Sequence, residues 1–205
     1  MDRELTTKER ILEVSARHFA DYGYGKTVLD NIANECKITK PAIYYYFKDK
    51  SSLYQEVLCS NFETLKRKVL KRTSDESPER ALEEYILGFG EFFVKNPYFS
   101  AIFARELSKS NPPMPEKCIK NMFALVERLS QILKKGEKQG IFEKQNPFVI
   151  QLMIVSTLTT YQTTKKIRES IRPLLGESLS PDYADNLEGD LIPSLIRKIV
   201  KGIKC

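Results

Sequence analysis

The chain has 205 residues, of which 41% are hydrophobic and 29% are charged, and its net charge is +6. This length can bury a substantial core, and the composition is that of a globular protein, which argues against a disordered tail. The opening residues, Met1-Asp2-Arg3-Glu4, are mostly charged and argue against a secretory signal, and the longest apolar stretch, 148–158, is too short to span a bilayer. We therefore expect a cytoplasmic protein.

The four cysteines lie far apart in the sequence, and no two of them form a Cys-x-x-Cys pair. The chain has a single histidine, His18, that could complement them in a metal site. Neither a zinc site nor a disulfide framework is therefore predicted from Cys36, Cys59, Cys118 and Cys205. We expect no metal and no cofactor.

Apolar residues recur at three- and four-residue spacing along most of the chain, and no stretch alternates over the length of a strand, so we expect an all-α fold. The pattern Thr6-x-x-Glu9 predicts a capping box that opens a first helix, and Gly23 is expected to end it. The pattern Thr27-x-x-Asp30 predicts that Thr27 caps a short second helix.

A third short helix is expected to begin at Thr39 or Lys40, where a proline in the first turn is tolerated. Ser51 or Ser52 is expected to cap a fourth helix, which ends at the break over residues 74–78. Proline and glycine stops delimit the helices expected beyond this break, which span 78–95, 98–108, 115–138, 147–168 and 187–203. We expect a three-helix head at residues 1–50, joined to a larger helical body at residues 51–205.

The second and third helices, separated by a turn of about four residues, are typical of a helix-turn-helix whose second helix enters a DNA groove. Successive helix positions turn by about 100°, so a run of three tyrosines cannot lie wholly in the core. An alternative interpretation is a surface helix whose aromatic rings cover its neighbours. Hydroxyl and ammonium donors suited to phosphate are supplied by Tyr44, Tyr45, Tyr46, Lys40, Lys48 and Lys50.

Residues 38–47 read Ile-Thr-Lys-Pro-Ala-Ile-Tyr-Tyr-Tyr-Phe and are followed by Lys50. This segment resembles the TetR-family pattern Val-Ser-Lys-Gly-Thr-Leu-Tyr-Tyr-His-Phe, which is also followed by a lysine. The first two helices of that family are matched by Ile11-Leu12, Phe19, Gly23-Tyr24, Thr27 and Ile32-Ala33. The resemblance covers roughly residues 6–58, and the body matches the family only in length and helical character.

The resemblance implies DNA contacts from the third helix and its surroundings. Base edges would be contacted by Thr39, Lys40, Pro41 and Ala42, phosphates would be bound by Tyr44, Tyr45 and Lys50, and Thr27 would cap the second helix against the DNA backbone. Lys37 stands where the turn usually has glycine, and a left-handed lysine costs about 1 kcal/mol. The third helix lacks Asn, Gln and Arg, so we expect apolar and backbone contacts to carry most of its base specificity.

Aromatic residues are concentrated in the middle of the body, where they form either a core or a ligand cavity. A Gly88-x-Gly90 pair within a helix would clear space beside Phe92, although close helix packing explains it equally well. The candidate ligand-binding residues are Tyr85, Phe89, Phe92, Phe103, Arg105, Phe123 and Tyr161.

The last helix carries two apolar rows, whereas docking on its own body requires only one. These rows are Leu187, Leu191, Leu195, Ile199 and Ile192, Ile196, Val200, Ile203. The helix over 147–168 is also apolar on most sides, and the two together resemble the family's dimer face, which pairs with its symmetry mate as a four-helix bundle. The alternative is that both helices are internal.

The resemblance implies a sequence-specific DNA-binding transcriptional regulator that acts as a homodimer. Our hypothesis is a repressor released from double-stranded operator DNA by a small apolar or aromatic ligand. The alternative is a protein of the same fold whose body binds a protein partner. We do not expect an enzyme, because the sequence has one histidine, no phosphate-binding loop and no nucleophile beside an evident base.

Overall fold

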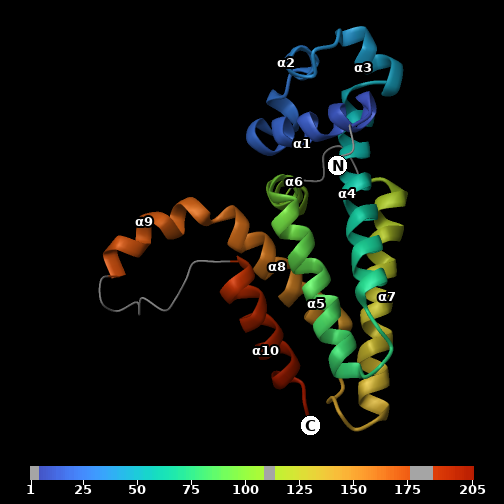
Figure 1. Ribbon diagram of the computed structural model, residues 1–205, viewed down its shortest axis with the longest axis vertical. Coiled ribbons are helices and arrows are strands. Elements are labelled where there is room, and N and C mark those ends of the chain that lie inside the picture. The colour runs from blue at the N-terminus through green and yellow to red at the C-terminus, as the bar shows by residue number, and fades with distance from the viewer. Residues whose placement is uncertain (1–4, 109–113, 176–186) are drawn as a thin grey trace.

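The computed structural model describes residues 5–108, 114–175 and 187–205, and within these ranges every extended regular element is a helix. The α-helices are α1 (Thr7–Lys26), α2 (Leu29–Glu35), α3 (Lys40–Tyr46), α4 (Lys50–Arg72), α5 (Pro78–Lys95), α6 (Pro97–Ser108), α7 (Glu116–Lys138), α8 (Pro147–Thr163), α9 (Lys165–Leu175) and α10 (Ile192–Gly202), with a π-helical turn, η2 (Leu187–Leu191), before α10. The predicted all-α class is confirmed. Figure 1 shows α1 to α3 as a small head at one end, with α4 leading into a body that ends at the C-terminus.

The predicted capping box opens α1. The Thr6 hydroxyl accepts a hydrogen bond from the backbone N–H of Glu9 at 3.3 Å, and the Glu9 carboxylate accepts one from the backbone N–H of Thr6 at 2.9 Å. At Gly23 the backbone takes φ = 74°, which kinks the helix, and α1 continues to Lys26. Gly23 therefore ends the first regular stretch of helix, as predicted, and a further short stretch of helix follows it within the bounds of α1.

Two predicted N-caps are wrong. The N-cap of α2 is Val28, which makes no side-chain cap, whereas Thr27 is buried and its hydroxyl donates to the carbonyl of Gly23 at 2.7 Å. The N-cap of α4 is Asp49, whose carboxylate accepts from the backbone N–H of Ser52 at 2.7 Å. The actual N-cap lies one position after the predicted one in α2 and two or three positions before the predicted ones in α4.

The helix α4 joins the head to the body. The Tyr54 ring packs on the ring of Phe19 in α1, with centroids 4.8 Å apart. Two turns further along, the Phe62 ring contacts Phe99 and Phe103 of α6 at 5.2 and 5.6 Å. The far end of α4 then packs along α5 and α7, so this single helix contacts both parts of the molecule.

The aromatic residues of the body pack against one another. The ring of Phe99 lies edge-on to Phe62, Phe92 and Phe93 and stacks on Phe103, with centroids 5.2 to 5.8 Å apart. Edge-to-face and offset stacked pairs at such distances are stabilising, so these rings form a packed core.

The glycine pair of α5 serves close helix packing, the second of the two explanations considered. A Cβ atom at Gly88 would lie 3.0 Å from the Val69 backbone in α4, and one at Gly90 would lie 2.5 Å from the Ile192 side chain in α10. Two neighbouring helices occupy this space, so the expectation that the pair clears room beside Phe92 is wrong.

The C-terminal helices are divided differently from the prediction. The expected helix over 147–168 is interrupted at Thr164, where the hydroxyls of Thr163 and Thr164 bond to carbonyls one turn back, a pattern that bends helices. The expected helix over 187–203 is split into η2 and α10, because Pro193 has no N–H to continue an α-helical ladder. No helix in the described ranges is long and apolar enough to cross a membrane.

A disulfide joins α4 to α7, contrary to the expectation from the sequence. Cys59 and Cys118 are 59 residues apart in the chain, but their Cα atoms lie 5.0 Å apart. Their sequence spacing gives no sign of the pairing, because the packing of two long helices brings them together.

Candidate DNA interface and helical body

The turn between α2 and α3 has the expected left-handed residue. Lys37 adopts φ = 56°, so the chain reverses here without the glycine that is usual at this position of the motif. Two buried side chains, Ile43 and Phe47, anchor α3 to the head. In Figure 1, α2 and α3 form the end of the molecule opposite the C-terminus, which leaves α3 free to approach a large ligand.

The tyrosine run lies on the outer face of α3. Tyr45 is 83% exposed, and Tyr44 and Tyr46 are exposed to a lesser extent. Thr39 and Pro41 are exposed at the start of the helix, where Ala42 is half-buried. These side chains form one surface with hydroxyl groups beside a short apolar end, which suits phosphate and base-edge contacts respectively. The α3 surface, as we call it, comprises Thr39, Lys40, Pro41, Ala42, Tyr44 and Tyr45.

Two lysines are positioned at the edges of the α3 surface. The Lys40 ammonium donates to the Asp30 carboxylate at 2.8 Å, and this hydrogen bond raises the pKa of Lys40. The Lys50 ammonium donates to the carbonyls of Thr27 and Gly25 at 2.8 and 3.2 Å. The same ammonium lies over the ring of Tyr24, 4.7 Å from its centroid, so three contacts with the segment around the end of α1 position Lys50.

Thr27 does not offer its side chain to DNA. Its hydroxyl points into the head and donates to the carbonyls of Gly23 and His18 at 2.7 and 3.1 Å. The implied role of Thr27, a cap of α2 against the DNA backbone, is therefore corrected: this side chain closes the end of α1. The carbonyl of Thr27 accepts a hydrogen bond from Lys50 at the start of α4.

The residues predicted to bind a ligand do not form one site. Tyr85, Phe89, Phe92 and Phe103 lie together in the core of the body, where each is almost completely buried. Phe123 is 64% exposed on α7 and belongs to the surface. The inward face of α7 is instead formed by residues such as Leu125 and Leu129, which are buried.

Two further members of the predicted set have other partners. Arg105 is exposed and donates to the carbonyl of Ala20 at 3.1 Å, which connects α6 to α1 in the head. The guanidinium of Arg168 lies over the ring of Tyr161, 3.8 Å from its centroid. Arg105 therefore belongs to the contact between head and body, and Tyr161 to the end of α8.

Two buried polar contacts were not predicted. The Tyr85 hydroxyl donates to the Gln151 side chain at 2.6 Å and joins α5 to α8; the only signal was one glutamine within an apolar helix. The Tyr54 hydroxyl donates to the Glu106 carboxylate at 2.6 Å and joins α4 to α6. Burial raises the pKa of Glu106 above its usual range. The second contact connects α4 and α6, both of which pack on α1 of the head.

In the described residues, a helix-turn-helix at one end and a helical body behind it form the architecture that is typical of helix-turn-helix DNA-binding regulators. Residues 11–57 match the family model described as bacterial regulatory proteins of the tetR family. The head therefore matches the DNA-binding domain of TetR-family helix-turn-helix transcriptional regulators, in agreement with the resemblance seen in the sequence.

Relatives extend the similarity beyond the head. The chain is 24% identical over 184 residues to the transcriptional repressor NicS of Pseudomonas putida, a match that covers 87% of this chain and 83% of the relative. A tetR-family regulatory protein from Rhodococcus RHA1 has a similar fold, with a TM-score of 0.76, 15% identity and coverage of 98% and 99%. The regulator FadR of Bacillus subtilis in complex with stearoyl-CoA is also similar, with a TM-score of 0.71, 19% identity and coverage of 95% and 98%.

Proposed function

We propose that the protein is a cytoplasmic repressor that binds an operator through the α3 surface. The observation that supports this most strongly is the exposure of Tyr44 and Tyr45 beside Lys40 on a helix at the free end of the head. Thr39, Lys40, Pro41 and Ala42 would read base edges, while Tyr44, Tyr45 and Lys50 would bind phosphates. Footprinting on the DNA upstream of the protein's own gene tests the proposal, and absence of protection at low ionic strength would contradict it.

Loss of a phosphate contact should weaken binding to every DNA sequence by a similar factor. We expect Lys50→Ala to lower the slope of log affinity against log salt concentration by about one unit. Tyr45→Phe removes a hydroxyl donor without a charge and should weaken binding while leaving the salt slope unchanged. Fluorescence anisotropy on operator and random duplexes across a salt series measures both effects. A loss confined to the operator would exclude the phosphate role.

Changes at the start of α3 should instead alter sequence preference. Pro41 is exposed in the first turn, where its ring can contact a base edge or a thymine methyl group. We expect Pro41→Gly to weaken operator binding by about 1 kcal/mol or more at one base position, with little change on random DNA. Selection of bound sequences from a random pool measures the preference. An equal loss on both DNAs would show that Pro41 does not read bases.

We further propose that two copies associate through the exposed apolar face of α8. Phe148, Val149, Leu152 and Met153 are all exposed, whereas Ile150, Ile154 and Leu158 face the body. The apolar residues of α10 are mostly buried against α5, so α10 contributes less to this face than its sequence predicted. Nearby, α9 exposes Ile167, Ile171 and Leu174 as it projects from the body in Figure 1. A two-fold dimer would place two α3 helices in successive major grooves, about 34–36 Å apart.

The proposed effector is a small apolar or aromatic molecule that binds in the body. The buried hydroxyl of Tyr85, bonded to the part-buried Gln151 side chain and to the Leu125 carbonyl, places polar groups in a mostly apolar interior, as ligand sites usually do. An effector that binds the free form more tightly than the operator-bound form must weaken DNA binding, and DNA must weaken effector binding by the same factor.

The experiment for the effector measures operator affinity and thermal stability with and without candidate compounds. Stearoyl-CoA is the first candidate, because the similarly folded FadR of Bacillus subtilis is known in complex with it. Compounds that raise the melting temperature and also lower operator affinity would support the proposal. A panel of lipophilic compounds without effect, together with specific retention of a protein by the immobilised regulator, would favour the alternative in which the body binds a protein partner.

A further inference from the structure

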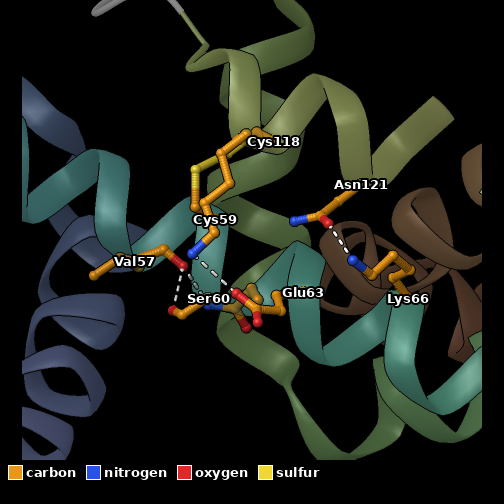
Figure 2. The surroundings of a disulfide bond; sticks show 9 residues. Val57, Cys59, Ser60, Glu63, Lys66, Cys118 and Asn121 are labelled. Carbon is orange, nitrogen blue, oxygen red and sulfur yellow. Dashed lines mark hydrogen bonds and ion pairs between the residues drawn. A yellow bond between two sulfur atoms is a disulfide. The ribbon is translucent and has the colours of Figure 1, made fainter. Parts of the chain in front are cut away.

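The disulfide between α4 and α7 lies at the junction of head and body. Figure 2 shows Cys59 on α4 and Cys118 in the first turn of α7, with the two side chains pointing toward each other. Both residues are buried, at 3% and 0% exposure. Along α4, Cys59 lies between Tyr54, which packs on α1, and Phe62, which packs on α6. The covalent bond therefore fixes α4 at the point where it passes from the head into the body.

Non-covalent contacts near the disulfide join the same two helices. Lys117 forms an exposed ion pair with Glu63 at 3.0 Å, and Lys66 donates to the Asn121 side chain at 2.7 Å, as Figure 2 shows for the second pair. An exposed ion pair contributes little to stability. Without the disulfide, these contacts and apolar packing would still hold α4 beside α7. No covalent bond would then restrict a small tilt of α4 relative to α7.

A regulator that binds its operator in the cytoplasm works where thiols are kept reduced, and disulfides there are usually transient or redox-sensing. We propose that Cys59 and Cys118 form a reversible redox site that sets how freely α4 can move relative to the body. This inference rests on the proposed function. When the pair is oxidised, the spacing of the two heads in a dimer is fixed, and when it is reduced, the heads adjust to the DNA.

The chemistry balances with a peroxide as oxidant. The thiolate of one cysteine attacks a peroxide oxygen, the O–O bond breaks, and a sulfenic acid and hydroxide form. The second thiol then attacks the sulfenic sulfur, the S–S bond forms and water leaves. Two thiols and one hydrogen peroxide thus give one disulfide and two waters. A dithiol reductant reverses the step by two thiol–disulfide exchanges and is itself oxidised to a disulfide. Because both sulfurs are buried, either reaction requires local opening of the helices.

The experiment compares the oxidised and reduced full-length chain on operators whose half-site spacing is varied by single base pairs. All proteins carry Cys205→Ser, because Cys205 is exposed and would form disulfides between molecules, whereas the other free cysteine, Cys36, is buried. Mass spectrometry after alkylation measures the oxidised fraction, and anisotropy measures affinity at each spacing. Cys118→Ala and Cys59→Ala serve as matched variants that cannot form the bond.

Operator affinity should fall as the half-site spacing departs from its optimum. We expect oxidation by hydrogen peroxide to make this fall about fivefold larger than in the reduced protein, which is the lower end of the coupling usual between two sites. Both alanine variants should keep the shallow profile of the reduced protein before and after peroxide treatment. Identical profiles for the two redox forms would overturn the inference, as would a disulfide that persists in a glutathione buffer at cytosolic potential. If neither form binds any operator, the proposed function itself fails. If both forms bind tightly and have the same dependence of affinity on half-site spacing, only the redox role is refuted.

Discussion

Leu152→Glu should dissociate the proposed dimer and lower operator affinity by about 1,000-fold, toward the non-specific level. Leu152 is 65% exposed on α8, at the centre of the apolar face that also contains Phe148 and Met153. A glutamate there would have to be desolvated without a partner when two copies associate, which is strongly unfavourable. A monomer would contact only one half-site, so most of the specific affinity would be lost. Analytical ultracentrifugation and anisotropy on the footprinted operator measure the two effects.

The matched control is Leu107→Glu. Leu107 is also 65% exposed but lies on α6, outside the α8 face, so the same change should leave the association state unaltered. Because both leucines are exposed, each variant should retain its helical circular dichroism signal. If Leu152→Glu sediments like the parent protein, or if the parent is a monomer at micromolar concentration, the α8 face is not the dimer interface.

The sequence predicts the parts of the fold that depend on neighbouring residues. The capping box of Thr6 and Glu9, the left-handed Lys37 and the bounds of α5 at Pro78 and Lys95 all follow from local hydrogen bonding and backbone sterics. The helix-turn-helix is predictable for the same reason, because its turn, its anchoring residues and its exposed tyrosines occupy a few consecutive positions. For this reason the family could be inferred from the head alone.

The contacts that join the head to the body could not be predicted. Arg105 meets the carbonyl of Ala20, 85 residues away in the chain, and Tyr54 meets Glu106 over 52 residues. Such pairs depend on the angles at which long helices pack, and those angles are set by many side chains at once. The Cys59–Cys118 disulfide was missed for the same reason, since cysteine spacing carries no information about packing.

The aromatic residues of the body show a different limit. Helical spacing predicts that Phe89, Phe92 and Phe103 face inward, and they do. The same pattern is compatible with a cavity and with a packed core, because both are apolar and differ only in how the rings fill space. Phe123 is also spaced as an inward residue, yet it is exposed, because α7 presents a wider apolar stripe than its neighbours cover.

Phe99→Ala is expected to lower the free energy of unfolding by about 3–5 kcal/mol. The ring of Phe99 contacts four others, from Phe62 of α4, Phe92 and Phe93 of α5 and Phe103 of its own helix. Its removal leaves a cavity between three helices and deletes four aromatic contacts, and a core of rigid rings relaxes little to fill the space. Urea unfolding followed by circular dichroism measures the loss, with every variant at the same protein concentration because association contributes to stability.

Phe123→Ala makes the same chemical change at a surface position and isolates the effect of packing. Because the Phe123 ring is 64% exposed, its removal should change the free energy of unfolding by about 0.5 kcal/mol or less. If the core is centred on Phe99, the free energy of unfolding must fall much more in Phe99→Ala than in Phe123→Ala. Comparable losses would mean that Phe123 is buried in solution, by a second copy or by a rearranged α7. A small loss for Phe99→Ala would instead mean that the rings are loosely packed around a cavity.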